Sequence, residues 1–355
     1  MSTPILGVGI IGAGPVTQAI HLPTLSRLED LFRVVHIMDV DAEVAASVAA
    51  RVGAKATTSI DDVLGDDEAQ IIVICSPSPF HAEQVIAACR AGKTAVLCEK
   101  PFAMSAEEAE QIAAVSADTG VPIIVGAMHT FDPGWLAARQ HWADLVESVH
   151  TIRYSVVLPP NARFEDVATE VLTRPVHAPA DPTDPEVAFR MLRGGILGLA
   201  IHDLPLVRVL CSDVSRVEVL SATALDPSGY SVTLRVGDCT VEMLAIFSQG
   251  FSTEWYLEAI ADDRSLRIDF TPSYVHAGSA TATLFEGTSA RVLGPFSMNG
   301  YEGEWRFLAD LAHGTAEPID VHELVDDLRF ALEVSDLASA AARDNAISMR
   351  STREA

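Results

Sequence analysis

The sequence predicts an α/β protein with two domains: a doubly wound, parallel Rossmann sheet, then an α+β domain with a mostly antiparallel sheet. The length of 355 residues suggests about two domains. From residue 4 to residue 127, short β-branched runs alternate with longer helical segments, which is typical of parallel strands joined by crossover helices. From 217 to 293, alternating runs are separated by turn pairs such as Ser228-Gly229. We therefore expect domains at residues 1–127 and 128–355.

The first domain contains five expected strands with alanine-rich helices between them. The helices include 41–52 and 105–118, and the strands are Ile5–Ile11, Arg33–Asp39, Ile71–Cys75, Ala95–Cys98 and Pro122–Gly126.

The second domain begins with a helix near 134–147 and a strand near 149–158. Residues 159–185 form a long loop, rich in proline and acids, which could cover a site. A single helix is then expected from about Glu186 to Leu210.

Composition and charge exclude several classes of partner. The net charge of -25 argues against nucleic acid and anionic membranes. No apolar run approaches the roughly 20 residues that a membrane helix needs. The N-terminus lacks the basic segment of a signal peptide, and the five cysteines form an odd set without a CxxC pair. We expect buried free thiols, no metal site and a soluble, cytoplasmic protein.

A glycine-rich turn, Gly12-Ala13-Gly14-Pro15-Val16-Thr17, follows the first strand and opens a helix. Backbone N–H groups and the helix dipole at such a turn favour a pyrophosphate. Thr17 replaces the third glycine of the usual dinucleotide motif, so an ordinary glycine-rich turn is the alternative interpretation.

Asp39 ends the second strand, where a carboxylate can accept hydrogen bonds from both ribose hydroxyls of an adenosine. The same charge would repel a 2'-phosphate, and no Arg or Lys immediately follows to neutralise one. NAD is therefore favoured over NADP. The alternative role for Asp39 is a turn or N-cap residue at the end of the strand.

Four stretches resemble the glucose-fructose oxidoreductase and inositol dehydrogenase family, Gfo/Idh/MocA. They are GIIGAGPVTQAIHLPTL at 9–25, VICSPSPFHAEQVIAACRAGKTAVLCEKPFAMSAEEAE at 73–110, GAMHTFDPGW at 126–135 and GGILGLAIHDLPLVRVL at 194–210. The most diagnostic of these residues are Glu99-Lys100-Pro101.

The resemblance implies a Rossmann domain followed by a domain with a large open sheet, through which a homo-oligomer would form. It places NAD along ten residues: Gly12, Gly14, Pro15, Val16, Asp39, Ser76, Pro77, His81, Glu99 and Lys100. In such enzymes the lysine hydrogen-bonds the substrate hydroxyl that is oxidised, and Lys100 inherits that role. A partly desolvated lysine loses its proton more easily, which suits this chemistry.

His202 matches the catalytic histidine of the family, which accepts the hydroxyl proton. A packed core histidine is the alternative. The family aspartate four residues earlier is replaced by Gly198, so the expected set is reduced to a Lys-His pair. Asp203 cannot simply stand in, because five residues of a continuous helix would rotate it about 140° away.

The substrate is expected to contact His129, Arg163 and Asp203. His129 lies where sugar and cyclitol dehydrogenases of the family commonly carry an arginine, although it is equally well interpreted as a polar loop residue. Arg163 is one of several arginines around the long loop that could bind hydroxyls or a carboxylate.

The leading hypothesis is an NAD-dependent oxidoreductase that transfers hydride between nicotinamide and a secondary hydroxyl or keto group of a sugar, cyclitol or related polyol. Gly198 leaves two alternatives open: redirected chemistry, such as transient oxidation with elimination or reduction of another carbonyl, and a non-catalytic NAD-binding sensor. Retention of both Lys100 and His202 favours an enzyme, since neither is needed merely to bind NAD.

Overall fold

The computed structural model describes residues 4–142, 144–174, 181–247, 250 and 253–354. The chain forms two compact units. The first contains residues 1–127, 164–176 and 301–329, and the second contains 128–163, 177–300 and 330–355. Two later segments of the chain therefore pack with the N-terminal region, in addition to the residues placed there from the sequence.

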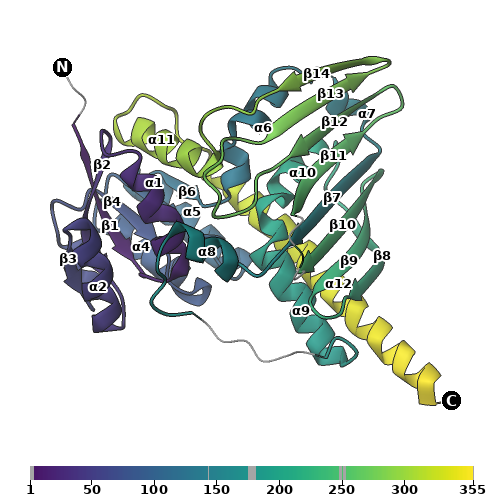
Figure 1. Ribbon diagram of the computed structural model, residues 1–355, viewed down its shortest axis with the longest axis horizontal. Coiled ribbons are helices and arrows are strands. Elements are labelled where there is room, and N and C mark those ends of the chain that lie inside the picture. The colour runs from purple at the N-terminus through teal and green to yellow at the C-terminus, as the bar shows by residue number, and fades with distance from the viewer. Residues whose placement is uncertain (1–3, 143, 175–180, 248–249, 251–252, 355) are drawn as a thin grey trace. The chain divides into compact units, whose positions relative to one another are not determined.

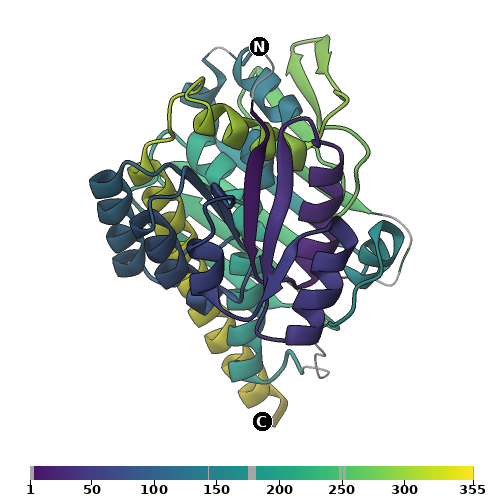
Figure 2. The ribbon, with the colours of Figure 1, turned by 90° about the vertical axis from the view of Figure 1, so that its left-hand side faces the viewer.

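The first unit contains a six-stranded parallel sheet in the order β3-β2-β1-β4-β5-β6 (Figures 1 and 2). The strands are β1 (Leu6–Ile11), β2 (Phe32–Met38), β3 (Lys55–Thr57), β4 (Ile71–Ile74), β5 (Ala95–Cys98) and β6 (Ile123–Val125). Every residue of β1, β4 and β5 is buried, as expected when helices cover both faces of a parallel sheet. The predicted doubly wound fold is confirmed.

Two helices of this unit, α2 and α5, begin and end at caps that their sequences provide. The elements are η1 (Thr17–His21), α1 (Leu22–Ser26), α2 (Ala42–Val52), α3 (Ile60–Leu64), η2 (Ser78–Phe80), α4 (His81–Arg90), α5 (Ala106–Thr119) and α11 (Gly300–Ala312). Asp41 caps the amides of Glu43 and Val44 in α2, and Ser105 caps Glu108 in α5. Both helices end at a glycine with positive φ.

The second unit is built on an eight-stranded sheet in the order β14-β13-β12-β11-β7-β10-β9-β8. Its strands are β7 (Thr151–Leu158), β8 (Val217–Ala224), β9 (Gly229–Val236), β10 (Cys239–Phe247), β11 (Glu254–Ile260), β12 (Arg264–Asp269), β13 (Thr281–Glu286) and β14 (Ser289–Leu293). Every pair is antiparallel except β7 with β10. The predicted mostly antiparallel sheet is confirmed.

The two faces of this sheet differ in chemistry. One face is buried along alternating residues such as Tyr154, Val156 and Leu257. Figure 1 shows α9 (Pro185–Gly198), α10 (Leu204–Leu210) and α12 (Val321–Glu354) beside the sheet. The other face carries cross-strand ion pairs from Arg153 to Glu242 and Glu258.

Several boundaries predicted for the second domain are wrong. The single helix expected over 186–210 is interrupted: α9 ends at Gly198, η4 (Ala200–His202) is a 3₁₀ turn, and α10 follows. Leu199 leaves helical geometry at φ -123 and ψ -59, and Pro205 restarts the helix in its first turn. The rotation of about 140° between positions 198 and 203, which was the reason that Asp203 could not replace the family aspartate, assumed a continuous helix. It therefore does not apply to this structure.

Other helices of the structure are shorter than predicted or were not predicted at all. The helix near 134–147 is two helices, α6 (Pro133–Arg139) and α7 (Leu145–Ser148), preceded by η3 (Met128–Phe131). The expected loop over 159–185 contains α8 (Ala162–Ala168), while its residues 175–180 lie outside the described part of the chain. In the described residues, no helix is long and apolar enough to cross a membrane.

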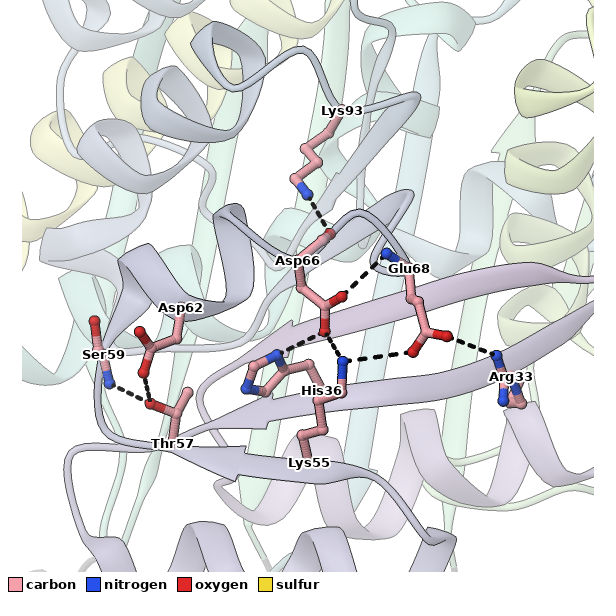
Figure 3. Close-up of polar contacts among 9 residues, drawn as sticks. All are labelled: Arg33, His36, Lys55, Thr57, Ser59, Asp62, Asp66, Glu68 and Lys93. Atoms are coloured by element: carbon pink, nitrogen blue, oxygen red, sulfur yellow. Dashed lines mark hydrogen bonds and ion pairs between the residues drawn. The ribbon is translucent and has the colours of Figure 1, made fainter.

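A polar cluster on the first unit joins β2, β3 and the segment that precedes β4 (Figure 3). The Asp66 carboxylate lies 3.0 Å from His36 Nδ1 and accepts a 2.9 Å hydrogen bond from Lys55 Nζ. Lys93 Nζ donates to the Asp66 carbonyl at 2.9 Å. The Lys55 hydrogen bond is the main cause of the lowered pKa of Asp66. This cluster ties the edge strand β3 to the sheet.

Replacing Asp66 with Asn should lower the free energy of unfolding by about 1–2 kcal/mol at pH 7, because the charged hydrogen bonds are lost. A lowered folded pKa stabilises the protein above the unfolded pKa of about 4, and this contribution is lost as the pH falls through the folded value. Urea unfolding across pH 7 to 3 should therefore show the two proteins converging. Asp67→Asn, at an exposed neighbour, is the control, and an Asp66→Asn deficit independent of pH would contradict the explanation.

Candidate functional site

The glycine turn lies at the carboxyl end of β1, where the backbone leaves no room for a side chain. Gly12 has φ +95, and a Cβ placed on it would lie 2.6 Å from the Ser76 nitrogen. At Gly14, by contrast, no described atom lies within 4 Å of such a Cβ, so the surface over this residue is open. A turn of this shape leaves space for a phosphate beside its amides.

Thr17 takes a structural role that explains the missing third glycine. Its side chain is buried and its hydroxyl donates a 2.6 Å hydrogen bond to the Gly12 carbonyl. Gln18 Nε2 donates to the neighbouring carbonyl of Ala13 at 2.7 Å. These two side chains hold the carbonyl groups of Gly12 and Ala13 in the turn. Thr17 therefore supports the turn although it replaces the third glycine of the motif.

Asp39 lies directly after β2 and faces the same turn. Its Oδ2 accepts a 2.8 Å hydrogen bond from the Ala13 amide, and its Oδ1 accepts a 3.0 Å bond from the Asp41 amide. The carboxylate therefore holds the turn and remains half-buried at the strand end. Each carboxylate oxygen has a second lone pair, so the same group can still accept from ribose hydroxyls.

The segment from Ser76 to His81 follows β4, the next strand of the sheet. Ser76 Oγ donates to Gln84 Oε1 at 2.6 Å, and Pro77 precedes η2. The ring nitrogens of buried His81 lie 2.8 Å from the Pro101 carbonyl and 2.7 Å from the Ser76 carbonyl. His81 thus links the segments after β4 and β5 from inside the unit.

Glu99 and Lys100 follow β5, at the same end of the sheet. Glu99 is buried, and its Oε2 accepts a 3.3 Å hydrogen bond from the Lys100 amide. Burial lowers the pKa of the Lys100 amine, while the charge of Glu99 raises it, and the lowering is the greater effect. The lysine therefore gives up its proton more readily than an exposed one.

The second unit contains a buried histidine and carboxylate pair, His129 and Asp203, whose pairing the sequence did not indicate. His129 Nδ1 lies 2.7 Å from Asp203 Oδ1, and the Trp255 indole donates to Asp203 Oδ2 at 2.8 Å. His129 stacks on Phe270 with ring centroids 3.7 Å apart. Asp203 is only 1% exposed, so both its oxygens are used to orient neighbouring groups.

His202 belongs to the same cluster. Its ring lies 5.9 Å from that of His129 and 6.0 Å from that of Trp255, measured between centroids. Two tyrosines, Tyr154 and Tyr230, lie near Asp203; burial is the main reason that the pKa of each is raised. The predicted residues His202, His129 and Asp203 are therefore neighbours in one unit.

The remaining predicted residues are placed as follows. Arg163 is exposed and donates to the Gly250 carbonyl at 3.2 Å. Gly198 is the last residue of α9, and apart from its chain neighbours and the backbone of its own helix, no described atom lies within 4 Å of a Cβ built there. Across the described ranges, no group of three or more His, Cys, Asp or Glu side chains could hold a metal ion.

Sequence reasoning missed Trp255, Phe270 and Tyr154, because residue spacing does not show that β7, β11 and the residue after β12 lie beside His129. The only local signal was the presence of bulky aromatic residues at inward-facing positions of β7 and β11.

Comparison with known proteins agrees with this architecture. Residues 6–127 match the family described as "Oxidoreductase family, NAD-binding Rossmann fold". Inositol 2-dehydrogenase 3 of Saccharopolyspora erythraea is 31% identical over 221 residues, covering 62% of this chain and 56% of that protein. The chain thus matches just over half of the length of that relative.

Two further similarities extend over nearly the whole chain. Inositol 2-dehydrogenase 2 of the same organism is 26% identical over 89% of this chain and 96% of its own length. The structure of UDP-N-acetylglucosamine 3-dehydrogenase from Acidithiobacillus ferrooxidans is 18% identical and has a TM-score of 0.73, covering 96% of this chain and 100% of that one. At this identity, the structural match supports the fold.

If Asp39 binds the ribose as the sequence predicts, replacing it with Ala should weaken NAD binding at least about tenfold and NADP binding much less, because two hydrogen bonds would be lost while repulsion of a 2'-phosphate would be relieved. Both affinities can be measured by calorimetry. Asp41→Ala is the matched control: it removes the N-cap of α2, at a cost of about 1 kcal/mol in stability, and should leave the ratio of affinities unchanged. Equal losses for both cofactors in Asp39→Ala would mean that Asp39 does not contact the ribose.

Proposed function

We propose that this chain, whose residues 6–127 match the Gfo/Idh/MocA oxidoreductase family, is an NAD-dependent dehydrogenase acting on a secondary hydroxyl of a sugar, cyclitol or related polyol. The observation that carries the proposal is the position of Lys100. It lies after β5, in the same unit as the glycine turn and Asp39, and burial favours its neutral form. Similarity to two inositol 2-dehydrogenases supports the substrate class.

The residues of the first unit fit a dinucleotide. The open surface at Gly14 would receive the pyrophosphate, together with Gly12, Pro15 and Val16, and Asp39 would bind the ribose. A bound NAD would supply the hydride acceptor. The segment containing Ser76 and Pro77, supported by His81, and the Glu99-Lys100 pair would border the nicotinamide end.

The protein has then to orient the substrate hydroxyl and take its proton. We assign hydrogen bonding of the hydroxyl to the Lys100 amine and acceptance of the proton to the imidazole of His202. His129 and Arg163 are assigned to contacts with other hydroxyls of the substrate. Asp203 has both oxygens bound within the protein, so we assign it to the orientation of His129.

We also propose that the protein forms a homo-oligomer through the face of the large sheet that carries Arg153, Glu242 and Glu258. This face combines ion pairs with partly exposed apolar residues such as Leu244 and Ile246. A cytoplasmic location is proposed from the cysteines, because all five are free thiols, as is usual in a reducing compartment.

The dehydrogenase proposal predicts NADH formation when the purified protein is mixed with NAD and a panel of sugars, cyclitols and sugar acids. Lys100→Met should lower kcat by at least about a hundredfold, because the amine that orients the hydroxyl is removed. NAD affinity should change little. Lys55→Met is the control, since Lys55 lies in the polar cluster around Asp66. Full activity in Lys100→Met would overturn the assignment.

Gly198 favours a second candidate, an enzyme of the same fold with redirected chemistry such as transient oxidation followed by elimination. In that case the protein would keep its NAD through turnover and release no stoichiometric NADH. A non-catalytic NAD-binding sensor would bind NAD, form no NADH and convert no substrate. Measuring both NADH release and substrate conversion therefore separates the three functions.

Gly198→Asp tests whether the missing carboxylate limits the reaction. A side chain can be accommodated at Gly198, because no described atom lies within 4 Å of its Cβ position. If the chain oxidises a polyol with the Lys100 and His202 pair, the added acceptor should raise kcat/KM about tenfold, equivalent to one charged hydrogen bond. Gly198→Asn is the uncharged control. A loss of activity in Gly198→Asp but not in Gly198→Asn would show that the site is adapted to the absence of a charge.

A further inference from the structure

A chain of buried hydrogen bonds leads from α11 to the residue beside Lys100. The Trp305 indole Nε1 donates to His21 Nδ1 at 3.2 Å, and His21 Nε2 lies 3.1 Å from Glu99 Oε1. Trp305 and His21 are fully buried. All of these residues belong to the first unit, although Trp305 is 284 residues away from His21 in the sequence.

The direction of these hydrogen bonds fixes the tautomer of His21. An indole nitrogen only donates, so His21 Nδ1 must present a lone pair to Trp305. The proton of a neutral imidazole is then on Nε2, which donates to Glu99. Burial lowers the pKa of His21, whereas Cys75 and Glu99 raise it by more. The Trp305 N–H opposes that rise, because it leaves no space for a second proton on Nδ1.

Glu99 depends on this donor for its charge. Burial raises the pKa of the Glu99 carboxyl, but His21 and then Lys100 lower it by more. The other acidic groups around the chain are Cys75, Cys98 and Glu304, and burial raises the pKa of both Cys98 and Glu304. The charge of Glu99 acts on the Lys100 amine, whose pKa it raises against the effect of burial.

We propose that His21 and Trp305 are positioning residues for Lys100: Trp305 holds His21 in its neutral Nε2–H tautomer, and His21 holds the Glu99 carboxylate beside the lysine. The proposal rests on the proposed function, in which Lys100 orients the hydroxyl that is oxidised. It assigns to α11, in the third segment of the first unit, control over how readily that lysine releases its proton.

The sequence makes a direct test practical, because it contains only three lysines: Lys55, Lys93 and Lys100. The pH dependence of their acetylation by acetic anhydride, read by peptide mass mapping, gives the titration midpoint of each amine. The full chain is used without NAD or substrate. A silent substrate panel would therefore overturn the proposed function without affecting this measurement.

His21→Leu should lower the midpoint of Lys100 by up to about one pH unit, because the pKa of Glu99 rises without its donor and the carboxyl then favours the charged lysine less. Glu99→Gln removes that charge outright and should give at least as large a shift. The double variant should give no more than Glu99→Gln alone, since His21 acts on Lys100 through Glu99. His21→Gln keeps a donor and should stay near the wild-type midpoint.

Glu304→Gln is the matched control on α11, because it replaces a fully buried acid, whose pKa burial raises, with a neutral amide of the same shape. It should leave Lys100 unchanged, and exposed Lys55 should titrate identically in every variant. An unchanged Lys100 midpoint in His21→Leu, or additive shifts in the double variant, would overturn the proposal.

The tautomer is tested separately by ¹⁵N NMR of the histidine rings, with His21 assigned by its loss in His21→Gln. The wild-type protein near pH 7 should show a protonated Nε2 and an unprotonated Nδ1. Trp305→Phe, which keeps an aromatic ring but lacks the indole N–H, should release the second site for protonation at lower pH. An imidazolium in the wild type, or an unaltered His21 titration in Trp305→Phe, contradicts the mechanism even if His21→Leu fails to fold.

Discussion

A carboxylate taken out of water must recover its hydrogen bonds from protein donors. In this chain, a few buried or half-buried acids meet this requirement by joining segments that are distant in the sequence. Asp39 takes the amides of Ala13 and Asp41, and so shapes the glycine turn. Asp203 takes an imidazole and an indole from distant segments. Asp132 takes the amides of Gly134 and Ala280, which ties α6 to the segment before β13.

The same requirement links structure to the proposed chemistry. A buried carboxyl group that protein donors hold in place acts on what lies beside it. Glu99 does so for Lys100 in the first unit, and Asp203 orients His129 next to His202 in the second. The absence of an aspartate at Gly198 therefore does not leave the second unit without a carboxylate near its histidines. Asp203 supplies that carboxylate, and it contacts His129 and Trp255.

The features that could be predicted from the sequence are those that depend on residues close together in the chain. Gly12, Asp39 and Glu99 each follow a strand, and parallel strands place their carboxyl ends at one edge, so the first unit could be anticipated in detail. The strand β3 was missed because its three residues are too few for a periodic pattern. The break after Gly198 was missed because GGILGLAIHDL has the hydrophobic content of a helix, and only the backbone at Leu199 departs from one. The pairing of His129 with Asp203 spans 74 residues, a separation over which spacing carries no information.

The division of the first unit among three segments has a consequence for how the protein is made. Trp305 is synthesised 284 residues after His21, which corresponds to roughly 15–60 s of translation at about 5–20 residues per second. During that interval the nascent Rossmann sheet has its strands but lacks α11, so Phe32 and His21 have no indole to pack against. The apolar surface that Trp305 later covers is therefore exposed on the ribosome until almost the whole chain has emerged.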